Sequence, residues 1–159
     1  EGPHRDDQFW LDLIEEGAQR YSVSGLRNVT PDRYFEDGET LEFEGVRFDI
    51  SHTPGHTPGH VVIHNTELKI AFVGDVLFAG SIGRTDFPRG NHEQLIHSIT
   101  SKLWPLGDEI AFVPGHGPTS TFGRERQSNP FVADRITGYA GATTHAPDIG
   151  EQRTSKRWS

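Results

Sequence analysis

Apolar and polar positions alternate in the first region of the chain that has a clear strand period. Val46, Phe48 and Ile50 are separated by polar residues, and this alternation is typical of a strand with one buried face. Gly38 and Gly45 flank short segments of this kind and indicate turns. We therefore expect two short strands here.

Three further segments have the composition of strands. Residues 61–63 are β-branched throughout and predict a third strand. Residues 70–73 and 110–113 contain apolar residues only, which is typical of a buried strand. The middle of the chain is thus expected to build a sheet.

Helical periodicity is present in three other segments. Apolar residues recur at helical spacing after an acidic pair at positions 6 and 7, which predicts a helix ending at Gly17. Asn91 is a candidate N-cap of a second helix that Pro105 ends. A short third helix is expected at residues 121–127. The inner face of the second helix consists of Leu95, Ile96, Ile99 and Leu103.

Length and charge narrow the class of protein. The 159 residues suit one domain, at roughly 150 residues per domain. The net charge of −8 disfavours a nucleic acid partner, because phosphates would be repelled. No apolar run is long enough to span a membrane. The absence of cysteine excludes disulfides and thiolate metal sites, and it fits a cytoplasmic protein.

Histidine is the first candidate for metal chemistry. The chain has nine histidines, and His52, His56, His60 and His64 are spaced four apart. On a helix they would form one stripe, but the intervening Pro-Gly pairs break a helix, so the four cannot share one site. His52 and His64 are expected on strands as packed or exposed side chains. His56 projects from a rigid turn and is a candidate metal ligand.

Two more candidate ligands directly follow the buried strands. Asp75 comes after Gly74, and a carboxylate at such a position is costly to bury unless it is paired or bound to a metal. His116 follows the second buried strand in a turn of proline and glycine. Each has a simpler interpretation, as a cap for Asp75 and as a packed loop side chain for His116. Together with His56 they favour a shared metal site.

Several motifs resemble those of the metallo-β-lactamase fold. They are TPGHTPGH at residues 53–60, GDVLF at residues 74–78 and PGHGP at residues 114–118. Within that superfamily, IGRTDFPRG at residues 82–90 and NPF at residues 129–131 resemble the short, glyoxalase II-like hydrolases. The resemblance implies an α/β fold, the αββα sandwich of this family.

The domain limits follow from the same comparison of motifs. The resemblance covers residues 1–133 and corresponds mainly to the C-terminal half of the fold. Residues 134–159 are small, polar and mixed in charge, so we expect a weakly structured tail there.

The resemblance also implies roles for the candidate residues. His56 would bind one metal ion, His116 would bind the other, and Asp75 would bridge the two through its two oxygens. His60 would support these ligands from nearby, and Arg84 would contact the substrate. The implied ions are zinc, with iron or manganese as alternatives, because nitrogen and oxygen ligands suit all three.

The activity that the resemblance implies is hydrolysis of a small-molecule thioester such as S-lactoylglutathione. A metal-bound hydroxide would attack the thioester, and no side-chain nucleophile is needed. Two alternatives remain open. One is a persulfide dioxygenase with a single iron ion, for which His56 and Asp75 would serve equally. The other is a non-catalytic module that keeps the fold.

One family motif, His-x-His-x-Asp-His, does not occur in the chain, and neither does methionine. We interpret the chain as the C-terminal portion of a longer protein, inactive by itself because most ligands of the first ion are missing. Without a partner sheet, apolar strand faces would be partly uncovered and would drive self-association. The residues expected on these faces are Val46, Phe48, Ile50, Phe72, Val73, Phe112 and Val113.

Overall fold

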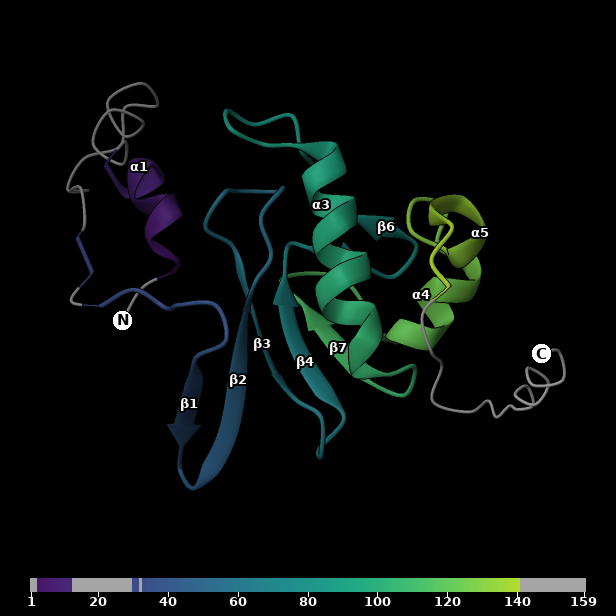
Figure 1. The fold of residues 1–159 in the computed structure, drawn as a ribbon, viewed down its shortest axis with the longest axis horizontal. Helices are drawn as coiled ribbons and strands as arrows, with labels where there is room; N and C mark the ends of the chain where they lie inside the picture. Colours follow the sequence, from purple (N-terminus) through teal and green to yellow (C-terminus); the bar gives the residue numbers. More distant parts are fainter. Residues whose placement is uncertain (1–2, 13–29, 32, 141–159) are drawn as a thin grey trace, which may run out of the picture.

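The computed structural model describes residues 3–12, 30–31 and 33–140 (Figure 1). The remainder of the predicted N-terminal helix and the tail after residue 140 lie outside the described residues. Inside the predicted tail, Asp134–Thr137 forms the short helix α5. None of the helices in the described ranges has both the length and the apolar character that a membrane crossing requires.

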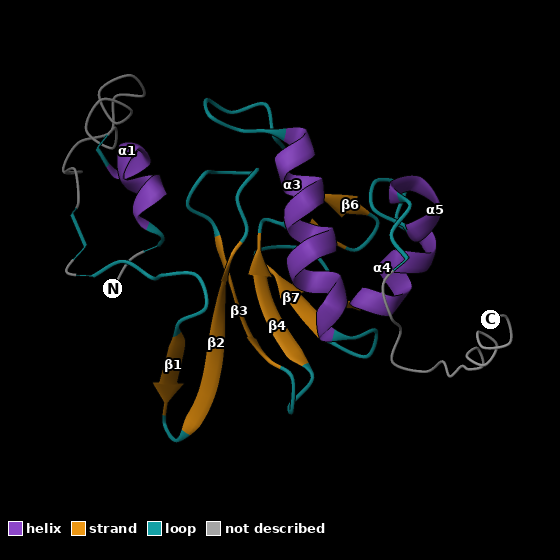
Figure 2. Cartoon of the chain, in the orientation of Figure 1, coloured by secondary structure: helices purple, strands orange, loops and turns teal. Residues whose placement is uncertain are grey.

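The strands confirm each of those predicted from the sequence and add short ones. They are β1 (Thr40–Phe43), β2 (Val46–His52), β3 (Val61–Asn65), β4 (Ile70–Gly74), β5 (Leu77–Phe78), β6 (Ser81–Ile82), β7 (Ala111–Pro114) and β8 (Ser120–Thr121). Six of them form one sheet in the order β1-β2-β3-β4-β7-β8, and β5 pairs with β6. Figure 2 shows β1, β2, β3, β4 and β7 side by side. The mixture of strands and helices confirms the α/β class.

Helices form in the three predicted segments as far as these are described, and α5 is a further helix that was not predicted. They are η1 (Arg5–Asp7), α1 (Gln8–Leu11), α3 (His92–Ser98), η2 (Ile99–Leu103), η3 (Trp104–Leu106), α4 (Phe122–Ser128) and α5. The Asn91 side chain accepts the backbone N–H of Gln94, so it caps α3 as predicted. The helix then continues as one π-helical segment, η2, and one 3₁₀ segment, η3, that contains Pro105.

One face of the sheet lies under α3 and its continuation. Leu95 of α3 belongs to the same buried cluster as Val73 and Phe112. Phe72 points to the opposite face and is 42% exposed. The expectation that Val73 and Phe112 would be uncovered is therefore wrong, because successive residues of a strand face opposite sides. It is also wrong for Ile50, which is 1% exposed.

Strand direction brings three loops to one edge of the sheet. Both β2 and β4 pair antiparallel with β3, so they run parallel to each other, and β7 is parallel to β4. The carboxyl ends of β2, β4 and β7 therefore lie at the same edge. The loops that follow these strands carry His56, Asp75 and His116. The fold thus gathers the predicted ligands from three separate segments.

Candidate metal centre

The two histidines predicted as ligands approach different oxygens of one carboxylate. His56 Nε2 lies 3.7 Å from Asp75 Oδ2. His116 Nδ1 lies 3.5 Å from Asp75 Oδ1. Two ligand atoms that each lie about 2.1 Å from one ion in a tetrahedral site are separated by about 3.4 Å. The observed spacings suit one ion between His56 and Asp75 and another between Asp75 and His116.

The ring of His56 is held in the orientation that a metal ligand needs. Its Nδ1 atom lies 2.8 Å from the backbone carbonyl of Arg84. A carbonyl oxygen accepts only, so Nδ1 donates to it, and Nε2, which faces Asp75, is the nitrogen that a neutral ring would offer to a metal ion. Phe87 packs edge-on against the same ring, at 5.4 Å between ring centres. The loop after Asp75 therefore orients His56.

His60 lies behind the carboxylate and contacts its backbone. The Nε2 atom of His60 accepts the backbone N–H of Asp75 at 3.2 Å. Burial lowers the pKa of His60 to about 4, and the nearby His56 adds to this effect. The ring is therefore neutral at neutral pH and able to accept. The supporting role that we expected for His60 stays a prediction, and it would act through this contact.

Glycines make room for this arrangement at positions where a side chain would collide. A Cβ atom on Gly115 would lie 2.7 Å from Asp75 Oδ1, and one on Gly83 would lie 1.9 Å from the Asp75 carbonyl oxygen. A Cβ atom on Gly74 would lie 2.7 Å from Nε2 of His60. The backbone therefore packs directly against Asp75, and this close approach explains the glycines in the motifs around it.

A cavity of about 530 Å³ opens beside the three predicted ligands. Besides the ligands, its lining includes Phe78, Ser81, Ile82, Gly83, Arg84, Phe87 and Gly117. The Arg84 side chain is 65% exposed and pairs with Asp86 at 2.9 Å. Its guanidinium also lies over the Phe87 ring, 4.4 Å from the ring centre. The site is an apolar hollow with a cation on its lining.

The other two histidines of the regular series lie elsewhere, as predicted. His64 is buried, with Nε2 lying 3.0 Å from the hydroxyl of Ser51. His52 stacks on His4 at 3.9 Å between ring centres.

The sequence did not indicate the role of Asp7, which was expected in the first turn of a helix. Its carboxylate instead binds the loop that carries His56.

The donor set suits a divalent transition metal. Two imidazole nitrogens and a carboxylate that offers both oxygens are ligands common to zinc, iron and manganese sites. The described residues supply these three side chains from one edge of the sheet. The structure therefore brings the three predicted ligands together, and their role as metal ligands stays a prediction.

Comparison with known proteins agrees with this geometry. The family model described as "Metallo-beta-lactamase superfamily" matches residues 2–116. The chain therefore belongs to the metallo-β-lactamase superfamily. It is similar to the hydroxyacylglutathione hydrolase GloC of Haemophilus influenzae, with 49% identity over 132 residues. That match covers 82% of this chain and 62% of the relative, so the chain spans less than two thirds of the relative's length.

Solved structures show the same fold. BLEG-1 B3 metallo-β-lactamase has a TM-score of 0.69 and 34% identity, and the match covers 82% of this chain and 63% of that one. The protein TTHA1623, solved in a di-iron-bound form, has a TM-score of 0.69 and 35% identity, again over 82% of this chain and 63% of that one. The fold thus occurs in a relative that binds two iron ions.

Proposed function

We propose that the full-length protein is a metal-dependent thioester hydrolase of the glyoxalase II type, acting on small thioesters such as S-lactoylglutathione. The observation that carries the proposal is the approach of His56 and His116 to opposite oxygens of Asp75 beside an open cavity. The similarity to a hydroxyacylglutathione hydrolase supports the substrate class. The lack of cysteine is compatible with the reducing cytoplasm, where we place the activity.

The proposed metal ligands are His56, Asp75 and His116. Zinc is the ion that we propose first, and iron is supported by the di-iron form of TTHA1623. Bound ions would supply an acidified water and polarise the thioester carbonyl. The protein's own contribution is to fix the two imidazoles and the carboxylate before the substrate arrives.

The cavity residues would bind and orient the substrate. Phe78, Ile82 and Phe87 offer an apolar surface that excludes water from the acyl group. Arg84 is the proposed contact for a negative charge on the thiol portion, because it is part of the cavity lining and Asp86 holds its exposed guanidinium. Removing Arg84 is therefore expected to raise KM more than it lowers kcat.

The test uses the full-length protein and two ligand variants, His56→Ala and His116→Ala. We expect about two metal ions per wild-type chain, hydrolysis of S-lactoylglutathione, and loss of both properties in each variant. His97→Ala is the control, because His97 lies on the exposed face of α3. Wild-type metal content in the ligand variants would contradict the site. One iron per chain with dioxygen-dependent turnover of a persulfide would favour the dioxygenase instead.

A further inference from the structure

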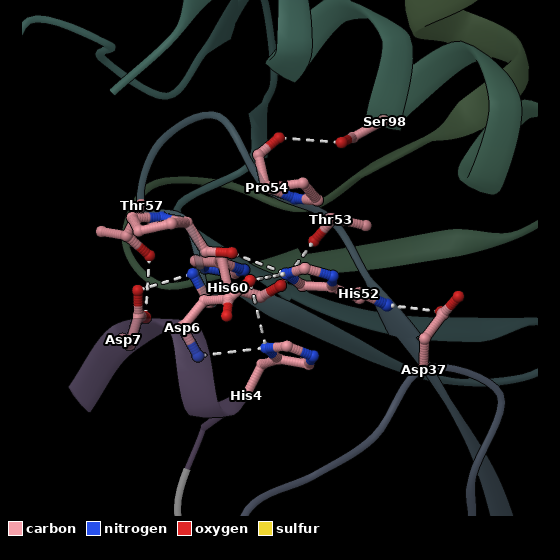
Figure 3. A network of polar contacts seen from close by, with 12 residues as sticks. His4, Asp6, Asp7, Asp37, His52, Thr53, Pro54, Thr57, His60 and Ser98 are labelled. Atoms are coloured by element: carbon pink, nitrogen blue, oxygen red, sulfur yellow. Dashed lines mark hydrogen bonds and ion pairs between the residues drawn. The ribbon is translucent and has the colours of Figure 1, made fainter. Parts of the chain in front are cut away.

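The turn at residues 57–59 joins His56 to His60 and is bound by the N-terminal segment. The hydroxyl of Thr57 donates to Asp7 Oδ2 at 2.8 Å, and the backbone N–H of Gly59 donates to Asp7 Oδ1 at 2.6 Å. Figure 3 shows Asp7 beside Thr57. Both oxygens of one carboxylate are therefore bound to the turn between the two histidines.

The close fit between Asp7 and this turn depends on a glycine. A Cβ atom on Gly59 would lie 2.4 Å from the backbone nitrogen of Asp7 and 2.7 Å from its Cγ. The backbone N–H of His4 also donates to the carbonyl of Gly59 at 3.1 Å. The start of the described chain thus packs against the turn backbone to backbone.

Two further histidines support the same turn. His52 Nε2 lies 2.6 Å from the carbonyl of Pro58, and Nδ1 of His4 accepts the backbone N–H of Asp6. His4, Asp6 and His52 bring possible ligand atoms within 4.8 Å of one another. One ring nitrogen of each histidine, Nδ1 of His4 and Nε2 of His52, is engaged in these hydrogen bonds, and the two rings are stacked with an angle of 5° between them. His52 therefore supports the turn directly, and His4 packs against His52.

The opposite side of the loop is fixed by α3. The backbone N–H of Asn91 donates to the carbonyl of Gly55 at 2.8 Å. The hydroxyl of Ser98 donates to the carbonyl of Pro54 at 2.8 Å, as Figure 3 also shows. A Cβ atom on Gly55 would lie 2.4 Å from Leu95. The loop with His56 and His60 is thus held between α3 and η1.

We propose that Asp7 is a positioning residue that sets the geometry of the metal centre by fixing the turn between His56 and His60. The inference rests on the proposed metal site. Without the Asp7 carboxylate, the hydroxyl of Thr57 and the N–H of Gly59 lose their acceptors, and the loop gains conformational freedom. Metal binding then has to restrict that freedom, which lowers the affinity.

The test compares Asp7→Ala, Asp7→Asn and the control Asp12→Ala in the full-length protein, with Co²⁺ as the probe. We expect Asp7→Ala to weaken Co²⁺ binding about tenfold or more and to change the visible absorption of the bound ion. Asparagine can accept from Gly59 and donate to the hydroxyl oxygen of Thr57, so Asp7→Asn is expected to restore most of the affinity and the spectrum. Asp12 is exposed on the same N-terminal segment, and its removal is expected to change neither.

A milder variant keeps the proposal testable if Asp7→Ala does not fold. Thr57→Val removes one of the two hydrogen bonds and is expected to weaken Co²⁺ binding in the same direction, with less effect. If Asp7→Ala folds and keeps the wild-type Co²⁺ affinity and spectrum, the role of Asp7 is overturned. If only Thr57→Val folds, the same result with that variant overturns it. Wild-type Co²⁺ binding by His56→Ala would instead overturn the proposed metal centre itself.

Discussion

The imidazole of His60 accepts the backbone N–H of Asp75, at 3.2 Å from Nε2. The contact acts on the main chain of Asp75, while the side chain of Asp75 faces the two other histidines. His60 therefore supports the carboxylate from behind, and it does so as a neutral ring because burial lowers its pKa to about 4. Asp75 and the two other histidines would thus bind metal, whereas His60 would orient Asp75.

Asp75→Ala is expected to remove more metal than His60→Ala in the full-length protein. The carboxylate would contact both ions, whereas His60 only orients it, and loss of such a supporting group typically costs about 10- to 100-fold in affinity. Metal analysis of both purified variants after dialysis measures the difference. Equal metal content in the two variants would remove Asp75 from the proposed bridging position.

Gly115→Ala is expected to reduce metal binding with little effect on folding. Its new methyl group would lie 2.7 Å from Asp75 Oδ1 and displace the carboxylate. Gly117→Ala is a matched control two residues away. Gly117 has open space around it but a φ of +87°, so this variant is expected to cost about 1 kcal/mol of stability and to keep its metal. Metal titration and thermal unfolding of both variants measure these effects, and full metal content in Gly115→Ala would contradict the prediction.

The stability of the protein is expected to fall in acid partly because of His64. Burial lowers the pKa of His64 below its ordinary value of 6.5, although the nearby Asp49 acts in the opposite direction. The unfolded chain therefore binds a proton at His64 that the folded chain does not. Above about pH 6.5, His64 is neutral in both states and does not change the free energy of unfolding. Below that pH, the free energy of unfolding falls as the pH decreases toward the pKa of His64 in the folded state.

His64→Gln tests this share of the pH dependence. Urea unfolding at about pH 7.5 and pH 5.5 should show a smaller loss of stability in the variant than in the wild-type protein. His97→Gln, at an exposed position, should behave like the wild-type protein. The same loss for His64→Gln and wild type would show that His64 does not contribute.

Phe112→Ala is expected to destabilise the protein by about 3–5 kcal/mol, because it removes a fully buried ring that packs against Phe122. Leu68→Ala is the control. Leu68 is 60% exposed, and its truncation is expected to cost less than about 0.5 kcal/mol. Chemical unfolding measures both changes, and similar values would contradict the assignment of Phe112 to the core.

The strands and the three candidate ligands could be predicted from the sequence because the patterns that indicate them are local. Period, β-branching and Pro-Gly turns are properties of neighbouring residues, so the segments around His56, Asp75 and His116 could be identified one by one. Their meeting at one sheet edge was inferred from the pattern of strand ends and from the family resemblance, and the strand directions agree with it.

What the sequence could not predict depends on contacts between distant segments. An entirely apolar strand has no alternation, so nothing local showed that Phe112 and Phe72 point to opposite faces of the sheet. Asp7 lies in a segment whose sequence is typical of the start of a helix. The helix dipole already stabilises an acidic residue in the first turn, so nothing in the sequence indicated a second partner for Asp7. Only the folded chain brings its carboxylate to Thr57, far along the sequence.

The parallel pairing of β4 and β7 also has a consequence for the order of events during folding. The two strands precede Asp75 and His116, and α3 with its continuation forms the crossover between them. Parallel pairing across such a crossover is slow, because the intervening chain must close before the contact stabilises it. On the ribosome, a nascent chain would therefore bring Asp75 and His116 together only after β7 has emerged. Binding of metal at the proposed site would then be a late step in biosynthesis.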